Sequence, residues 1–238
     1  MHVERAPAKL TLSLRITGTR PDGYHLLDAE MVAIDHGDIL TFSEGDGLEV
    51  VGPFADRVPT GDDNLVRRAL AAAGRRALVR LEKQVPAGAG LGGGSSDAAA
   101  VLRWAGCRDR AVAAGLGADV PFCLVGGRAR ARGIGELVEP LPFQGLTFTL
   151  SVPPVPVDTA AVYRMWDELG GPAAGGGSGN DLEAAALAVA PELAEWRERL
   201  TLATGRPARL AGSGGTWFVE GEFPGEDRIV TRTVPAHR

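Results

Sequence analysis

The chain has 238 residues, enough for one large domain or two small ones, and it is 45% hydrophobic and 23% charged, as is usual for a globular protein. Its formal net charge of −5 argues against nucleic acid or an anionic membrane as the main partner, and no apolar run is long enough to span a bilayer. The first residues have no apolar signal core and the two cysteines form no CxxC pair, so we expect a cytoplasmic protein with buried thiols.

Alternating polar and apolar side chains over residues 9–17 predict a half-buried strand with Lys9 and Thr11 on its polar face. A turn-rich stretch then leads to Tyr24 and His25, which taken alone would be a partly buried aromatic residue and a surface histidine. Further along, the pattern predicts short strands over 30–35, 38–43 and 48–51, a helix over 65–76 capped by residues 62–64, and a strand over 77–85.

The most informative stretch is residues 86–97, in which five glycines fall within seven residues. Glycine has no Cβ, so backbone N–H groups there can approach a ligand closely. The sequence Ser95-Ser96-Asp97 before an alanine-rich run over 98–105 predicts a capped helix. Unpaired N–H groups and the helix dipole both favour anions at a helix N-terminus, so this stretch predicts a phosphate site rather than a flexible linker. It lacks the Gly-Lys-Ser/Thr ending of the Walker loop, and the chain has no HRD or DFG motif of protein kinases.

The rest of the chain mixes helices and strands. Asp119 stands between Gly117 and Pro121, a position that a plain helix cap would also explain. Later patterns predict a strand pair over 128–138, a strand over 146–152, a helix over 159–169, a flexible glycine loop over 175–179, a helix over 181–204 broken at Pro191, strands on both sides of a glycine turn over 209–219, and a last strand over 228–234. Without strict βαβ alternation, these elements favour an α+β protein in two lobes.

Three stretches together resemble the motifs of the GHMP small-molecule kinases, namely residues 6–9, 86–99 and 210–215. The sequences RPDGYHLL over 20–27 and GADVPF over 117–122 resemble one branch of that superfamily, which phosphorylates a cytidine diphosphate derivative of methylerythritol in the non-mevalonate isoprenoid pathway. The resemblance covers nearly the whole chain. It implies a two-lobed α+β fold, with a ribosomal S5 domain 2-like ATP-binding lobe over 1–143 and a ferredoxin-like lobe over 144–238.

The resemblance also implies roles for individual residues. Asp119 would be the catalytic base and Lys9 its partner, with ATP and Mg²⁺ as cofactors and the metal ligands unknown. Residues implied to bind ATP are Asn64, Lys83, Pro86, Ala87, Gly88, Ala89, Gly90, Leu91, Gly92, Gly93, Gly94, Ser95 and Ser96. Residues implied to bind the small-molecule substrate are Thr11, Tyr24, His25, Thr159 and Tyr163, with the two tyrosines placed to sandwich the pyrimidine. The expected state is a monomer or homodimer.

Two features of the chain differ from the family pattern. Thr11 stands where an asparagine is usual, and the chain is short. Another GHMP kinase, acting on homoserine, mevalonate or a sugar, would explain the glycine loop but would leave Tyr24, His25 and Tyr163 without a role. A non-catalytic nucleotide-binding relative or an RNA-binding domain is disfavoured by the acidic charge and by the presence of both Lys9 and Asp119.

Overall fold

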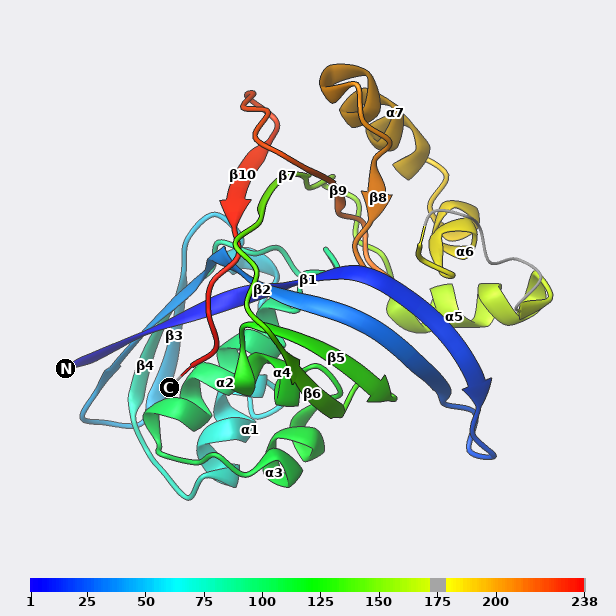
Figure 1. The fold of residues 1–238 in the computed structure, drawn as a ribbon. Coiled ribbons are helices and arrows are strands. Elements are labelled where there is room, and N and C mark those ends of the chain that lie inside the picture. Colours follow the sequence, from blue (N-terminus) through cyan, green and yellow to red (C-terminus); the bar gives the residue numbers. More distant parts are fainter. Residues whose placement is uncertain (172–178, 238) are drawn as a thin grey trace.

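The computed structural model describes residues 1–171 and 179–237, so most of the glycine loop predicted over 175–179 lies outside the described residues. A large sheet has the strand order β3-β4-β2-β5-β6, and β1 pairs with β2 (Figure 1). Its strands are β1 (His2–Thr19), β2 (His25–Ser43), β3 (Gly47–Val51), β4 (Leu78–Glu82), β5 (Arg128–Gly133) and β6 (Leu137–Leu141). The strands β1 and β2 form a long antiparallel hairpin, whereas β3 and β4 run parallel.

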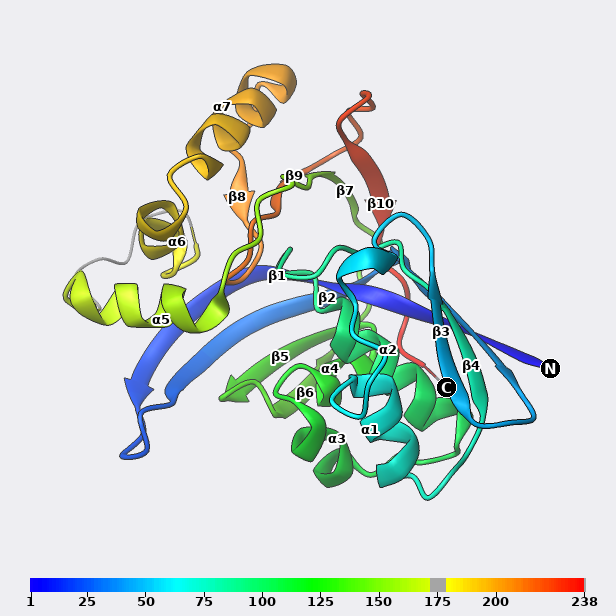
Figure 2. The ribbon, with the colours of Figure 1, turned by 180° about the vertical axis from the view of Figure 1, so that it is seen from behind.

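Helices cover one face of this sheet, as Figures 1 and 2 show from opposite sides. They are α1 (Leu65–Ala72), α2 (Gly93–Trp104), α3 (Arg110–Leu116) and α4 (Val120–Val125), and a short 3-10 turn, Ala55–Arg57, precedes α1. The central helix is α2, which contacts α1, α4 and β1. Its residues 98–102 are fully buried, and three of them are alanines, whose small side chains let the helix pack closely on its neighbours.

A second, antiparallel sheet has the order β10-β7-β9-β8. It consists of β7 (Thr147–Ser151), β8 (Arg209–Leu210), β9 (Trp217–Glu220) and β10 (Ile229–Arg232), and it is accompanied by α5 (Thr159–Glu168), α6 (Glu183–Val189) and α7 (Leu193–Thr204). The expected α+β class is therefore confirmed, and the chain passes from one sheet to the other between β6 and β7. The break predicted at Pro191 is also confirmed, because it separates α6 from α7.

Two local predictions are wrong. The chain does not break into two strands at His36-Gly37, since β2 runs through both residues. Gly37 lies so close to Pro7 and its neighbour on β1 that an added Cβ would stand 2.2 Å from the Ala6 carbonyl oxygen. The glycine-loop helix is not capped by Ser95, Ser96 or Asp97, because α2 already begins at Gly93. Gly92 takes the N-cap position with a φ of 65°, a conformation that favours glycine.

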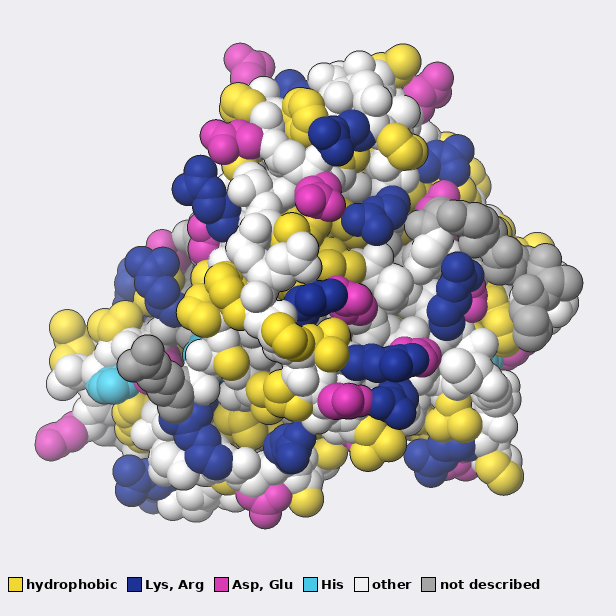
Figure 3. All heavy atoms as spheres, viewed as in Figure 1, with side chains coloured by type: hydrophobic (Ala, Val, Ile, Leu, Met, Phe, Trp, Pro, Cys, Tyr) yellow, Lys and Arg dark blue, Asp and Glu magenta, His cyan; other side chains and the backbone are white. Residues whose placement is uncertain are grey.

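Charges of both signs are interspersed on the face of the molecule in Figure 3. Many are paired between neighbouring strands, as in the ion pairs of Arg128 with Glu30 and of Arg130 with Asp28. Within residues 1–171 and 179–237, no helix has the length and hydropathy to cross a membrane.

Candidate active site

A single large cleft of about 920 Å³ brings together most of the residues expected to form the site. Its walls come from the glycine loop, the start of α1, the tip of the β1-β2 hairpin, the start of α5 and the turn at Gly212-Ser213. The predicted residues that line it are Lys9, Tyr24, His25, Asn64, Lys83, Pro86, Ala87, Gly88, Ala89, Gly90, Gly92, Gly93, Gly94, Ser95, Asp119, Thr159 and Tyr163. The other three lie behind this wall, where Thr11, Leu91 and Ser96 are each 1% exposed.

The glycine loop packs backbone to backbone on a second glycine turn, which leads into β9. An added Cβ on Gly90 would lie 2.4 Å from the Ala211 carbonyl oxygen, and one on Gly214 would lie 2.0 Å from the Gly90 nitrogen. A hydrogen bond from the Thr216 N–H to the Ala89 carbonyl, 3.1 Å long, holds the two segments together. Only glycine permits so close an approach, so two glycine motifs far apart in sequence form one wall of the cleft.

Lys9 and Asp119 meet at the floor of the cleft. The Lys9 Nζ lies 3.4 Å from Asp119 Oδ2, with the lysine side chain 8% and the aspartate side chain 31% exposed. Lys9 also donates to Thr11 Oγ1 at 3.2 Å, and its aliphatic chain fills the space beside Gly92, where an added Cβ would stand 2.7 Å from Lys9 Cγ. The ammonium is therefore held in one place, beside a carboxylate that solvent or a ligand can reach.

Asp119 precedes α4, but it does not act as a helix cap. Its backbone has helical dihedral angles, and its side chain makes no capping hydrogen bond with the described residues. The helix starts with Pro121 in its first turn, a residue that needs no N–H partner. The plain helix-cap explanation is thus not supported, and the carboxylate is available for chemistry in the cleft.

Aromatic side chains cluster at the opposite end of the cleft. The His25 ring stacks on Tyr163, with centroids 5.0 Å apart, and meets Trp166 edge-on at 5.3 Å. Its Nε2 lies 2.8 Å from Asp167 Oδ1. Burial, with Asp119 nearby, raises the pKa of the Tyr163 hydroxyl, which stays protonated. Tyr24 is 59% exposed, and the Arg20 guanidinium lies 5.8 Å from the centre of its ring, which leaves the other face for a flat ligand.

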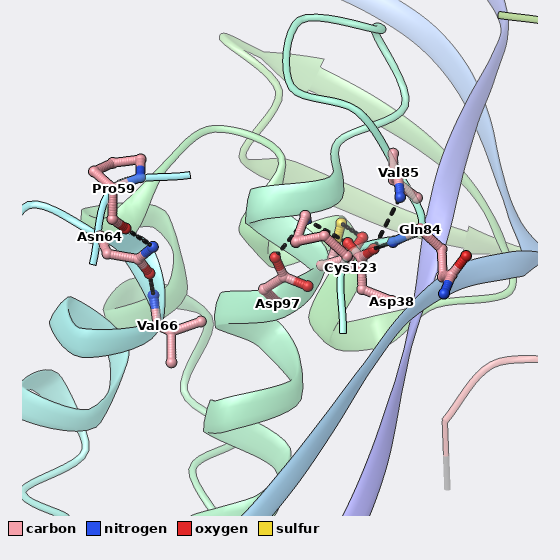
Figure 4. A network of polar contacts seen from close by, with 10 residues as sticks. Asp38, Pro59, Asn64, Val66, Gln84, Val85, Asp97 and Cys123 are labelled. Carbon is pink, nitrogen blue, oxygen red and sulfur yellow. Dashed lines mark hydrogen bonds and ion pairs between the residues drawn. The ribbon is translucent and has the colours of Figure 1, made fainter. Parts of the chain in front are cut away.

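Lys83 and Asn64 both contact other groups of the protein, and Figure 4 shows Asn64 between Pro59 and Val66. The Asn64 side chain accepts from the Val66 N–H at 2.8 Å and donates to the Pro59 carbonyl at 2.6 Å, so it caps α1 and fixes the preceding loop. The Lys83 ammonium donates to Asp38 at 2.5 Å and to Asp97 at 2.8 Å. Both residues border the cleft, but their polar ends contact other protein groups.

Sequence reasoning missed four polar residues that shape the site, namely Asp38, Asp97, Asp167 and Asn180. Asn180 donates to the carbonyl oxygens of Leu210 and Gly212 at 2.9 and 2.7 Å and so fixes the glycine turn. Asp167 follows Tyr163 by four residues on α5, a spacing that places both on one helix face and that could have revealed it. Asp97 lies within the glycine motif but was expected only as a helix cap, and Asp38 and Asn180 were missed because their partners Lys83 and Leu210 lie 45 and 30 residues away in the sequence.

Residues 64–127 match the model of the GHMP kinases N terminal domain. The chain is 42% identical to a 4-diphosphocytidyl-2-C-methyl-D-erythritol kinase of Paracoccus denitrificans over 233 residues, which covers 90% of this chain and 85% of the relative. The kinase of the same name from Granulibacter bethesdensis is 37% identical over 273 residues, covering 99% of this chain and 90% of the relative.

A solved structure supports the same relationship. The crystal structure of a 4-(cytidine 5'-diphospho)-2C-methyl-D-erythritol kinase is 33% identical to this chain and has a TM-score of 0.76. The match covers 98% of this chain and 100% of that chain. A homoserine kinase from Cytophaga hutchinsonii shares the fold with a TM-score of 0.62 at 19% identity, with 98% of this chain and 94% of that chain covered. With the glycine loop and the cleft described above, these relationships establish that the chain is a small-molecule kinase of the GHMP superfamily and belongs to its 4-diphosphocytidyl-2-C-methyl-D-erythritol kinase family.

Proposed function

We propose that this kinase transfers the γ-phosphoryl group of ATP to the 2-hydroxyl of 4-diphosphocytidyl-2-C-methyl-D-erythritol, a step of the non-mevalonate route to isoprenoid precursors. The names of its relatives support the substrate. The observation that carries the proposal is the Lys9–Asp119 pair, 3.4 Å apart, in the same cleft as the glycine loop and the aromatic cluster.

Pro86 to Ser96 would hold the ATP phosphates with backbone N–H groups at the start of α2. The loop fits this group, because bare backbone at Gly92 and Gly93 faces the cleft where any side chain would collide with Lys9 or Val85. Asn64 and Lys83 would border the nucleoside. Mg²⁺ would accompany the ATP phosphates and neutralise their charge, since Mg²⁺ binds nucleotides mainly through phosphate oxygens and water.

In the reaction, the substrate hydroxyl oxygen attacks the γ-phosphorus as the bond to the ADP oxygen breaks. Asp119 accepts the hydroxyl proton. Lys9 neutralises the carboxylate and the charge that develops on the transferred group, and Thr11 holds the lysine in place through the hydrogen bond to its Nζ. The two residues thus supply positioning and proton transfer, which are the main demands of phosphoryl transfer.

The cytidine end of the substrate would lie among the aromatic side chains. Tyr24 offers an exposed ring for stacking. The His25 Nε2 already contacts Asp167, so His25 would hydrogen-bond the base through its other ring nitrogen, Nδ1. Tyr163 supports His25 from behind, and Thr159, hydrogen-bonded to Ser213 at 3.0 Å, would contact the substrate where α5 begins.

Two further points belong to the proposal. Residues 1–143 act as the ATP-binding domain and 144–238 complete the acceptor site, in a monomer or homodimer without a nucleic-acid or membrane partner. The enzyme acts in the cytoplasm, with support from its two cysteines, Cys107 and Cys123, which are both free.

The test is turnover by the purified protein with ATP and Mg²⁺ on a panel of acceptors. We expect phosphorylation of 4-diphosphocytidyl-2-C-methyl-D-erythritol and at least ~100-fold lower kcat/KM for homoserine or mevalonate, because these lack the cytidine group that the aromatic end binds. Preference for one of the other acceptors would overturn the proposed substrate while leaving the kinase assignment in place.

A further inference from the structure

Three charged side chains are buried together directly beneath the glycine loop. Asp38, Lys83 and Asp97 are 1%, 3% and 2% exposed. The Lys83 Nζ donates to Asp38 Oδ2 at 2.5 Å and to Asp97 Oδ2 at 2.8 Å. We refer to these three residues as the buried triad.

The triad joins three elements that meet at the two ends of the glycine loop. Asp38 comes from β2, and its Oδ1 accepts from the backbone N–H groups of Gln84 and Val85 at 2.5 and 2.9 Å, where the chain enters the loop (Figure 4). Asp97 lies in α2, one turn beyond the point where the loop ends. Lys83 connects the two carboxylates. The loop is thus anchored on both sides through one ammonium group.

The surroundings make these contacts strongly coupled. Burial lowers the pKa of Lys83, but the two carboxylates more than offset this and the pKa of the ammonium is raised. Burial, with Asp38 nearby, raises the pKa of Asp97, whereas Lys83 lowers it. The Asp97 Oδ1 atom is also buried and finds no hydrogen-bond partner among the described residues. Removing one member would therefore leave the others buried and uncompensated.

The triad also lies close to the loop backbone. An added Cβ on Gly93 would stand 3.2 Å from Lys83 Nζ, and both Lys83 and Asp97 border the cleft. A displaced ammonium would therefore disturb Gly93, where α2 starts and where the N–H groups proposed to hold the ATP phosphates lie.

We propose that the buried triad of Asp38, Lys83 and Asp97 is a positioning device that holds the glycine loop in its nucleotide-binding conformation before ATP arrives. This inference rests on the proposed function only in taking ATP as the ligand of the loop. Lys83 then acts through the loop, and Asp38 and Asp97 fix the position of Lys83.

Stability alone does not explain three buried charges. Replacing a buried ion cluster by apolar side chains of similar size is often neutral or stabilising, whereas charged groups accept only a few partner arrangements. A loop held in the bound conformation loses less entropy when the ligand arrives, so it binds more tightly. The triad is thus expected to contribute to ATP affinity, in addition to the stability that is lost when one of its members is removed.

The test compares Lys83→Met with a matched control, Arg103→Met. Arg103 is also a buried cation, but it lies at the far end of α2, where it pairs with Glu4 and donates to the carbonyl oxygens of Arg5 and Cys123. ATP affinity is measured by calorimetric titration, KM is measured for both substrates, and hydrogen exchange is followed over residues 84–96. Thermal unfolding is recorded for both variants.

We expect Lys83→Met to raise the ATP Kd at least ~10-fold and to speed exchange in residues 84–96, with the acceptor KM within about twofold. Arg103→Met should lower thermal stability but leave the ATP Kd unchanged. A folded Lys83→Met protein with unchanged ATP Kd would overturn the proposal, as would an equal loss of ATP affinity in both variants.

If Lys83→Met does not fold, Asp38→Asn answers the same question. This change keeps the side-chain shape and one acceptor for the backbone N–H groups, but it removes the charge that holds Lys83. We expect a several-fold higher ATP Kd, and an unchanged Kd in the folded variant would again contradict the inference. A wild-type protein that binds ATP but does not phosphorylate the cytidine substrate would instead count against the proposed function alone.

Discussion

At the residue scale, the Asp119 carboxylate makes no capping hydrogen bond with the described residues, and this makes its chemical role directly testable. We expect Asp119→Asn to lower kcat by about 10²–10⁴-fold, since asparagine has the same shape but cannot accept the proton. ATP should still bind, and the unfolding temperature should fall only modestly, because the wild-type side chain makes no capping hydrogen bond with the described residues and Lys9, which loses its ion-pair partner, keeps its hydrogen bond to Thr11. Steady-state kinetics and a thermal melt test both points. An active variant would exclude Asp119 as the base.

Lys9 occupies a narrow space between two glycines. An added Cβ would stand 2.7 Å from Lys9 Cγ if placed on Gly92 and 3.3 Å from Nζ if placed on Gly212. We therefore expect Lys9→Arg to lose most activity, because a planar guanidinium neither fits this space nor replaces a point charge. The double variant with Asp119→Asn should have a kcat only slightly below that of the less active single variant, because the effects of residues that act on one step are not additive. Fully additive losses in kcat would mean that the two residues act independently.

Tyr24 offers a test of the cytidine end. It is 59% exposed in the cleft, so Tyr24→Ala should raise the KM for the cytidine substrate by roughly tenfold, which corresponds to the ~1–3 kcal/mol of a base stacked on an aromatic ring. Stability should change little. Phe143→Ala is the matched control, because that ring is 53% exposed outside the cleft lining, and its KM should equal that of the wild type. Equal KM values in both variants would rule out stacking on Tyr24.

At the element scale, the glycine loop is defined by its neighbours as much as by its own flexibility. Gly92→Val should abolish ATP binding in a folded protein, because the side chain would collide with Lys9 and the φ of 65° disfavours any Cβ. Gly74→Val is the control, since Gly74 has a similar φ of 60° but no atom of the described residues within 4 Å of an added Cβ. It should cost some stability and leave ATP titrations unchanged. Intact ATP binding by Gly92→Val would contradict the loop assignment.

The elements also show what could be predicted from the sequence. Alternation identified the strand around Lys9, and Pro191 marked a helix break, because both signals act within a few residues. The start of α2 differs from the prediction, because Ser95 to Asp97 resemble a typical cap whereas the helix already begins at Gly93, after Gly92 with a φ of 65°. In the site, the motif residues were found, whereas Asp38 was not, since its partner Lys83 is 45 residues away.

At the scale of the whole molecule, the segment after β10 ties the two sheets together. The Val234 N–H donates to the Ala33 carbonyl and the His237 N–H to the Val125 carbonyl, each at 2.9 Å, which brings the end of the chain back to β2 and α4 (Figure 2). An added Cβ on Gly126 or Gly127 would stand only 2.8 Å from His237 or Ala236. The segment after β10 therefore links the second sheet to β2 and α4 of the first lobe.

This connection should make stability depend on pH. Burial, and to a smaller extent the charge of the nearby Arg103, lowers the pKa of His237 to about 4. Burial also lowers the pKa of His36. Between pH 4 and 6.5 the unfolded chain then binds more protons than the folded one, so stability rises with pH across this range. The contribution of neutral His237 to the free energy of unfolding is fully present above pH 6.5 and is lost as the pH falls towards 4. Asp97 gives the opposite slope, because its raised pKa favours the folded state at low pH.

A comparison of the wild type with His237→Gln isolates this contribution, because His36 and Asp97 are present in both proteins and cancel in the difference. We expect the free energy of unfolding, measured in urea at several pH values, to fall less steeply for the variant between pH 6.5 and 4. Glutamine retains hydrogen-bonding capacity but takes up no proton in this range, and the backbone bond to Val125 is kept. The two proteins should therefore differ in free energy of unfolding at pH 7. This difference should change as the pH falls, in the direction that favours the variant. Parallel curves over the whole range would mean that His237 takes up its proton equally well in the folded and unfolded chain, and that the end of the chain does not respond to acid through this residue.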